Sequence, residues 1–217
     1  FPPEAQTALA LNQTANPHFA SDGSSWTASN GTGTDTCAAS TATNQTSFST
    51  FAFTSGDGNS AGSWQGVSGT GNNTRYKGRI SQSFTMPGNG TVKVKGRMDY
   101  QLTGATLRAS NADGFVRLDI YDSANSTLVA NLTCTQLPSS SPGWTTQSFS
   151  SNTNLTGGTT YTIRVTLAYR NSGTNSATVK IDNVIVTAAP TGLSVSGPTN
   201  SKSASLSWTT SAAGTGA

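Results

Sequence analysis

The chain has 217 residues, of which 33% are hydrophobic and only 10% charged, and its formal net charge is +3. Disordered chains combine high net charge with few β-branched or aromatic residues, so this composition excludes that class and we expect a folded protein. The 12 Lys and Arg residues form no run, and no apolar stretch reaches the roughly 20 residues of a membrane span, which excludes a nucleic-acid-binding patch and a transmembrane helix.

The N-terminal third of the chain is polar. Residues 1–14 form an extension, and residues 21–74 are dominated by Ser, Thr, Gly and Asn with few apolar anchors. We expect long loops there, with one short strand over 48–53, and function in a β-sandwich often lies on such loops. This composition is typical of extracellular β-proteins, so we expect a secreted or cell-surface chain whose first residue is a mature or trimmed start.

Apolar and polar residues alternate with period two further along the chain. The alternation is clearest over 91–102, 115–122 and 161–170. Weaker strands are expected over 80–86, 127–135, 145–149 and 178–187. No segment of twelve residues carries a helical stripe, so the predicted fold class is all-β, an antiparallel β-sandwich. We expect the three clearest strands to bury one face and to present Arg and Asp on a single shared polar face.

The chain has two cysteines, Cys37 and Cys134. An even pair in a polar, secreted chain is typical of a disulfide rather than of a metal or redox site. The alternative is two separate buried thiols. A bond between them would close a loop of about 100 residues and stabilise the fold by roughly 4 to 5 kcal/mol.

Five short motifs give the chain a family resemblance. They are residues 16–20 (NPHFA), 25–29 (SWTAS), 80–84 (ISQSF), 158–165 (GTTYTIRV) and 180–186 (KIDNVIV). In their order and spacing, residues 15–188 resemble the jelly-roll carbohydrate-binding modules and, more loosely, the galactose-binding-like superfamily. The resemblance implies a jelly-roll sandwich over 15–188, but a fold does not fix a function.

That family commonly holds a structural Ca²⁺ with an acidic residue after the first motif and the Asp of the closing strand. Here Ala20 replaces the acid, while Asp182 remains and Asp22 lies nearby. The resemblance therefore implies Asp22 and Asp182 as ligands of a structural Ca²⁺, with a turn-capping role of Asp182 as the alternative.

The composition changes again after residue 188. Residues 190–195 (PTGLSV) and 204–208 (ASLSW) resemble the first two strands of a fibronectin type III domain. Two strands cannot bury a core alone, so residues 189–217 are a partial domain or a tail that pairs with another sheet edge. If the tail is ordered, we expect it to pair with a neighbouring copy or to pack on its own sandwich.

Catalysis is not expected of this chain. Glycosidases need two carboxylates about 5 to 10 Å apart, and the single Glu lies in the Pro-flanked N-terminus. Asp99 and Asp119 are expected on neighbouring strands, but Arg97 and Arg117 beside them would keep both ionised and poor as general acids. His18, the one histidine, is expected on a loop at the rim rather than in a triad.

Candidate glycan-binding residues come from two places. Trp64 and Gln65 lie in a Gly-rich segment without apolar alternation, so we predict an exposed Trp64 ring that stacks on a sugar, with a core position as the alternative. The shared polar face supplies the others. These are Arg97, Asp99, Gln101, Arg117, Asp119, Tyr121 and Arg164. The alternative for that face is a solvated surface held by ion pairs.

Eight Asn-x-Thr sequons are candidate glycosylation sites. They begin at Asn12, Asn30, Asn44, Asn72, Asn89, Asn125, Asn131 and Asn154. All eight use Thr, which favours glycosylation if the source has the machinery. The alternative is that these sequences are turns that lead into strands.

Two functions remain open on the sequence. The first is a non-catalytic extracellular module that binds a polysaccharide or glycan surface or mediates attachment. The second is a structural subunit of a filament or surface layer, a homo-polymer that assembles by β-strand pairing through the C-terminal tail. The state of association separates them, because strand exchange predicts a polymer and a binding module predicts a monomer.

Overall fold

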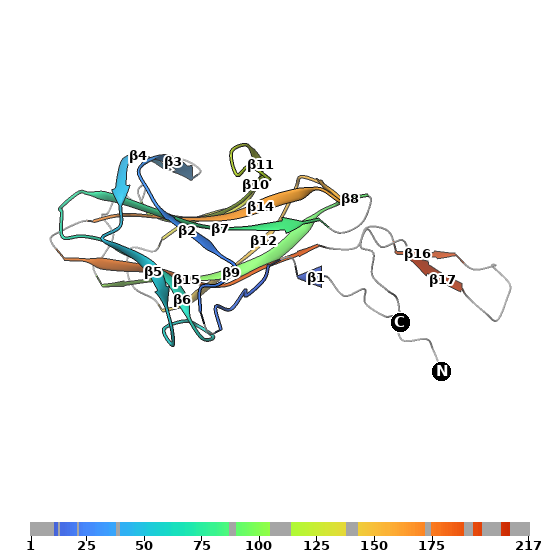
Figure 1. Ribbon diagram of the computed structural model, residues 1–217, viewed down its shortest axis with the longest axis horizontal. Coiled ribbons are helices and arrows are strands. Elements are labelled where there is room, and N and C mark those ends of the chain that lie inside the picture. Colours follow the sequence, from blue (N-terminus) through green and yellow to red (C-terminus); the bar gives the residue numbers. More distant parts are fainter. Residues whose placement is uncertain are drawn as a thin grey trace.

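The computed structural model describes residues 11–12, 14–20, 22–37, 40–86, 90–104, 114–137, 143–171, 175–188, 193–196 and 205–208. No helix occurs in this part of the chain, and none of its segments could therefore cross a membrane as a long apolar helix. Two large sheets lie face to face as a sandwich (Figure 1). The predicted all-β sandwich is confirmed.

The first large sheet, sheet A, has the strand order β12-β9-β15-β6-β5, with β1 beside β15. Its strands are β12 (Thr145–Ser150), β9 (Val94–Gly104), β15 (Ala177–Ala188), β6 (Ser63–Val67), β5 (Thr50–Thr54) and β1 (Leu11–Asn12). All their pairings are antiparallel. A register shift in β15 between Asp182 and Ile185 interrupts its ladder with β9.

The second large sheet, sheet B, has the strand order β11-β10-β14-β7-β4-β3, with β2 beside β7. Its strands are β11 (Leu128–Gln136), β10 (Phe115–Asp122), β14 (Thr160–Arg170), β7 (Arg75–Thr85), β4 (Ser40–Ser47), β3 (Gly33–Cys37) and β2 (Thr27–Asn30). Two short pairs complete the described strands. They are β8 (Thr91–Val92) with β13 (Leu155–Thr156), and β16 (Leu193–Ser196) with β17 (Ser205–Trp208).

The core lies between the inward faces of the two sheets and consists of apolar side chains at alternating positions. On β14 these are Ile163, Val165 and Leu167, all fully buried, and on β9 they include Met98 and Leu102. The period-two pattern therefore located the central strands correctly, because each of them buries one apolar face.

The expectation of one shared polar face is wrong. The strand predicted over 91–102 is β9 of sheet A, whereas those predicted over 115–122 and 161–170 are β10 and β14 of sheet B. Alternation assigns a residue to the inside or the outside of a sandwich but does not say which of the two sheets it belongs to. The polar residues are thus divided between opposite outer faces.

The expectation that residues 21–74 are mainly loops is also wrong. This segment contributes β2, β3, β4, β5 and β6. The strands are polar because several lie outside the core, and β2 is exposed at all four positions. A strand that contributes no face to the core has no apolar alternation by which it could be recognised.

The tail strands β16 and β17 are antiparallel partners, with Leu193 opposite Trp208. Figure 1 shows this hairpin beyond one end of the sandwich. Among the described strands, β16 and β17 pair with each other and with no strand of sheets A or B. Pairing with a neighbouring copy stays a prediction, as does the resemblance to fibronectin type III.

Candidate functional site

A candidate binding face lies on the outer side of sheet B. The register of three adjacent strands builds it, because Asp119 on β10 pairs with Arg164 on β14, and Thr166 on β14 pairs with both Arg117 on β10 and Arg79 on β7. Residues paired across antiparallel strands point to the same side of a sheet. The alternation that turns Ile163 and Val165 inward therefore turns these charged residues outward.

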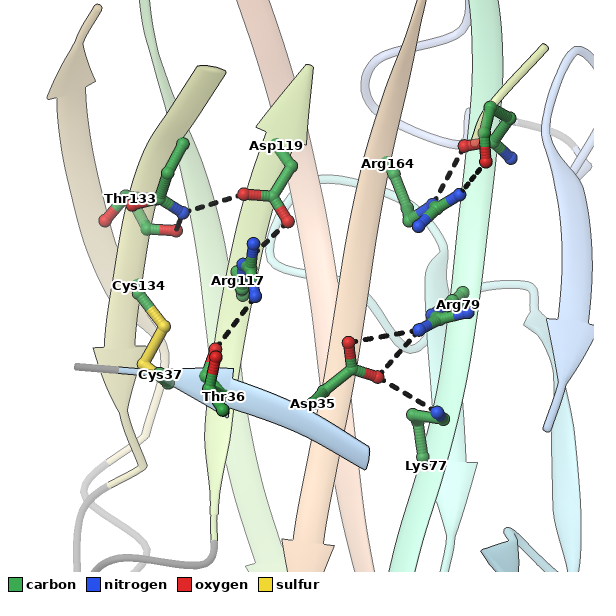
Figure 2. Close-up of polar contacts among 12 residues, drawn as sticks. Asp35, Thr36, Cys37, Lys77, Arg79, Arg117, Asp119, Thr133, Cys134 and Arg164 are labelled. Atoms are coloured by element: carbon green, nitrogen blue, oxygen red, sulfur yellow. Dashed lines mark hydrogen bonds and ion pairs between the residues drawn. A yellow bond between two sulfur atoms is a disulfide. The ribbon is translucent and has the colours of Figure 1, made fainter. Parts of the chain in front are cut away.

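Strand β3 crosses this face and covers part of it. We call Gly33–Cys37 the β3 strap, and Figure 2 shows it running across β10 and β14. At one end Cys37 is bonded to Cys134 on β11, with 5.5 Å between the two Cα atoms. The predicted disulfide is confirmed, and it fixes the strap to β11, an edge strand of sheet B.

An ion-pair cluster holds the middle of the β3 strap. Asp35 accepts hydrogen bonds from Arg79 Nη2 at 3.0 and 2.8 Å, and Lys77 Nζ lies 3.0 Å from the same carboxylate. Lys77 is only 2% exposed. A charge so deeply buried must be paired, so Asp35 fixes the position of the strap over β7.

A second ion pair lies beside the strap. Arg117 Nε is 2.7 Å from Asp119 Oδ2, and Arg117 Nη1 donates to the carbonyl oxygen of Thr36 at 2.9 Å. Asn131 Nδ2 donates to Asp119 Oδ1 at 2.7 Å. Burial raises the pKa of Asp119, although the Asn131 hydrogen bond and the Arg117 charge act in the opposite direction. The carboxylate thus orients both the guanidinium and the amide.

The third cation of the face, Arg164, stacks on an aromatic ring. Its Cζ atom lies 3.5 Å from the centroid of the Tyr121 ring, which is a cation–π contact. Arg164 also donates from Nε to Asn125 Oδ1 at 2.8 Å and from Nη2 to the Asn125 carbonyl oxygen. Burial lowers the pKa of Arg164, which stays far above neutrality as for any arginine. The Tyr121 ring is consequently covered and offers no free stacking surface.

A hollow of about 180 Å³ opens beside the β3 strap. We call it the Arg117 hollow, and Thr36, Arg117, Asn131 and Cys134 line it. Thr36 and Asn131 are exposed, so solvent reaches the hollow freely. Its lining offers a guanidinium, an amide and a hydroxyl, which are the groups that hydrogen-bond sugar hydroxyls and acidic groups.

The candidate residues of sheet A do not form a second open site. The prediction of an exposed Trp64 is wrong, because the ring is only 7% exposed and packs on Phe51 and Phe53. Gln65 is buried too, and its Nε2 donates to Asp57 Oδ2 at 2.8 Å and to Ser63 Oγ at 2.9 Å. Stacking by Trp64 on a ligand would require the core to open.

The remaining candidates on β9 differ in accessibility. Arg97 is exposed and Gln101 is half-buried, whereas Asp99 is only 2% exposed. Asp99 accepts from Thr146 Oγ1 at 2.7 Å and from Asn183 Nδ2 at 2.5 Å. Asp99 is therefore held in an internal hydrogen-bond network and does not point to a ligand.

The calcium site implied by the resemblance stays a prediction, and the described residues form no carboxylate cluster there. Asp182 is fully buried, and its two oxygens accept from the backbone N–H groups of Ser60 at 2.8 Å and Asn183 at 2.6 Å. Asp22 is exposed and accepts from the N–H of Ser24 at 2.9 Å. Calcium needs six to eight oxygen ligands, and no group of three or more His, Cys, Asp or Glu among the described residues could hold a metal ion.

The Asn side chains of the sequons differ in their surroundings, because some form hydrogen bonds within the protein and others are exposed to solvent. Asn30 clamps the backbone of Phe48, donating from Nδ2 to its carbonyl oxygen at 2.7 Å and accepting from its N–H at 2.8 Å. Asn125 and Asn131 hold Arg164 and Asp119 as described above, whereas Asn72 and Asn154 are exposed. The side chains of Asn12, Asn44 and Asn89 lie outside the described part of the chain.

Sequence reasoning missed the residues of the strap and its anchors. Asp35 and Thr36 showed no pattern, because the strap lies on the sheet surface and carries no apolar stripe. Lys77 and Arg79 alternate with other residues as in a strand, but that pattern did not mark them as anchors of the strap. One signal was available in the charges. Asp35 lies two residues before Cys37, so a disulfide from Cys37 to a strand of the sandwich keeps this carboxylate within two residues of the sheet.

Comparison with known proteins finds similarity in structure only. No family model matches the chain, and no curated protein matches its sequence. A carbohydrate-binding module, TmCBM61 in complex with β-1,4-galactotriose, is 12% identical with a TM-score of 0.46, over 82% of this chain and 98% of that one. The K1 cleaved adhesin domain of Lys-gingipain from Porphyromonas gingivalis W83 is 14% identical with a TM-score of 0.43, over 85% and 99%.

A third similar structure is the enzymatically active domain of bacteriophage CBA120 tailspike protein 4. It is 15% identical with a TM-score of 0.47, and the match covers 82% of this chain but only 21% of the tailspike chain. The chain is thus a β-sandwich distantly similar to carbohydrate-binding modules and adhesin domains. This similarity is one of fold alone.

Proposed function

We propose that this chain is a non-catalytic extracellular attachment module that binds carbohydrate in the Arg117 hollow. The observation that carries the proposal is the convergence of Arg117, Asn131 and Thr36 on one solvent-open hollow. Asp119 and the disulfide fix this lining in place, so little side-chain entropy is lost when a ligand binds. A disulfide between distant strands also suits an oxidising, extracellular compartment.

The same geometry argues against hydrolysis. The two carboxylates considered from the sequence, Asp99 and Asp119, lie on different sheets and point to opposite outer faces. Each is buried and accepts hydrogen bonds from an Asn amide. The two carboxylates therefore cannot lie on either side of one glycosidic bond, as a two-carboxylate mechanism requires.

The test is binding to a panel of neutral and charged polysaccharides, measured by affinity electrophoresis and calorimetry. Arg117→Lys keeps the charge but removes the planar fork of donors, so we expect affinity to fall by about tenfold. Arg97→Lys is the matched control, because Arg97 is exposed on the other sheet, and it should leave affinity unchanged. Absence of binding to every polysaccharide, or equal loss in both variants, would overturn the proposal.

A second candidate function is the structural subunit of a filament. The observation that favours it is the β16–β17 hairpin, which pairs with no strand of the sandwich among those that the structure describes. A two-stranded hairpin is marginally stable alone and offers two open edges to another chain. Sedimentation of the full chain against a chain that ends at residue 188 tests it, since only the full chain should self-associate.

A further inference from the structure

The outer face of sheet B concentrates the positive charge of the chain. Six of its 12 Lys and Arg residues occupy outward positions on the adjacent strands β7, β14 and β10. They are Arg75, Lys77, Arg79, Arg117, Arg164 and Arg170. Two carboxylates lie among the central members of this set, Asp35 on the strap and Asp119 on β10.

The outer face of sheet A has no such excess. On its described strands the cations are Lys95, Arg97 and Lys180 and the acids are Asp99 and Asp182, and Asp57 lies on an adjoining loop. Lys180 Nζ lies 2.7 Å from Asp57 Oδ1, so part of this charge is paired directly. The two faces of one sandwich therefore differ in their electrostatic character, and this difference points to the sign of a partner.

Among the described residues, the charge near the Arg117 hollow is only partly neutralised. Asp35 serves both Lys77 and Arg79, and Asp119 is within ion-pair distance of Arg117. Arg164 contacts an amide, a backbone carbonyl and a ring, all of them uncharged. Four cations thus surround two carboxylates, which leaves a positive field over the hollow.

Within the described part of the chain, Arg117 has N–H donors that form no hydrogen bond or ion pair. A guanidinium carries five N–H groups, and the contacts described above use its Nε and one donor of Nη1. The remaining donors belong to a side chain that lines the hollow. A planar guanidinium with free donors binds carboxylate or sulfate groups in a two-point geometry.

We infer that the ligand of the Arg117 hollow is an anionic polysaccharide, one whose sugars carry carboxylate or sulfate groups. This inference rests on the proposed function and specifies its ligand class. A single-stranded nucleic acid is disfavoured, because such ligands need open aromatic platforms and the Tyr121 ring is covered by Arg164.

Thr36→Glu tests the inference, because it places a carboxylate inside the hollow at an exposed position of the strap. Thr34→Glu is the matched control. Thr34 is exposed on the same strand and does not line the hollow, so it changes the net charge equally. Thermal unfolding of both variants would verify that the sandwich and strap remain intact.

The probes are polygalacturonate for carboxylates, dextran sulfate for sulfates, neutral dextran and xylan, and duplex and single-stranded DNA. We expect the chain to bind at least one of the two acidic polysaccharides, and we expect a higher salt concentration to weaken that binding. The affinity should fall by about tenfold or more in Thr36→Glu but not in Thr34→Glu. Arg117-dependent binding to neutral polysaccharides alone would overturn this inference while leaving the proposed function intact. Binding to DNA alone, equal losses in both Glu variants, or no binding at all would also overturn it.

Discussion

Removal of the Cys37–Cys134 disulfide is the sharpest test of how the strap is held. The bond joins residues separated by 97 positions. Closing a loop of this size removes unfolded-state entropy worth about 4.7 kcal/mol in the chain-entropy model. Cys37 is buried against Phe115 and Ala168, so alanine is the replacement that places no new polar group there. The Cys37→Ala, Cys134→Ala double variant should therefore lose about 4 to 5 kcal/mol of unfolding free energy.

The measurement is guanidinium unfolding of the oxidised chain and the double variant, followed by tryptophan fluorescence. The slope of free energy against denaturant should also rise in the variant, because its unfolded chain is more expanded. Hydrogen exchange at the strap amides should accelerate more than at β14. A loss below about 1 kcal/mol would refute the reasoning, since it would mean that the bond constrains neither state.

Three further outcomes are expected. Trp64→Ala should cost about 3 to 5 kcal/mol of unfolding free energy in urea, and a loss below about 1 kcal/mol would contradict its buried position. Burial raises the pKa of Asp182, so the folded state binds this proton more tightly than the unfolded state and stability falls as pH rises through the window above about 3.9. Asp182→Asn should flatten that part of the melting profile, and an unchanged profile would contradict the assignment. The backbone N–H groups of Ser126 and Thr127 lower the pKa of Asp122 to about 2. A carboxyl NMR titration should therefore find the midpoint of Asp122 well below that of an ordinary Asp. The contribution of Asp122 to stability should disappear as pH falls from about 3.9 towards 2.

The sequence predicted the core strands well because burial leaves a periodic trace. Strands β9, β10 and β14 each carry apolar residues at alternate positions, and the structure places them within a few residues of the expected ranges. The disulfide followed from the number of cysteines and the character of the chain. The pairing of strands into sheets left no such trace, so Asp99 and Asp119 were expected on one face and occur on two.

The misplacement of Trp64 has a specific physical origin. Glycines around it suggested a loop, but they are there because aromatic rings lie directly on the backbone. A Cβ atom at Gly66 would lie 2.7 Å from the Phe48 ring, and one at Gly62 would lie 2.4 Å from the Phe53 ring. Close packing of this kind requires glycine, within β6 at Gly66 and directly before β6 at Gly62. Only the position of the packing ring distinguishes such a glycine from one in a turn.

The pairing of Leu11 with Ala188 has a mechanical consequence. It makes the first and last strands of the sandwich leave at the same end, so a load applied through them would peel β1 from β15 one hydrogen bond at a time. The disulfide then limits how far the chain can lengthen, because the segment between Cys37 and Cys134 is withheld from extension. That segment corresponds to about 330 Å of extended chain. In a pulled molecule, β1 would separate from β15 at an early stage. Extension would then stop at the disulfide, with β7 and β10 still inside the covalently closed loop.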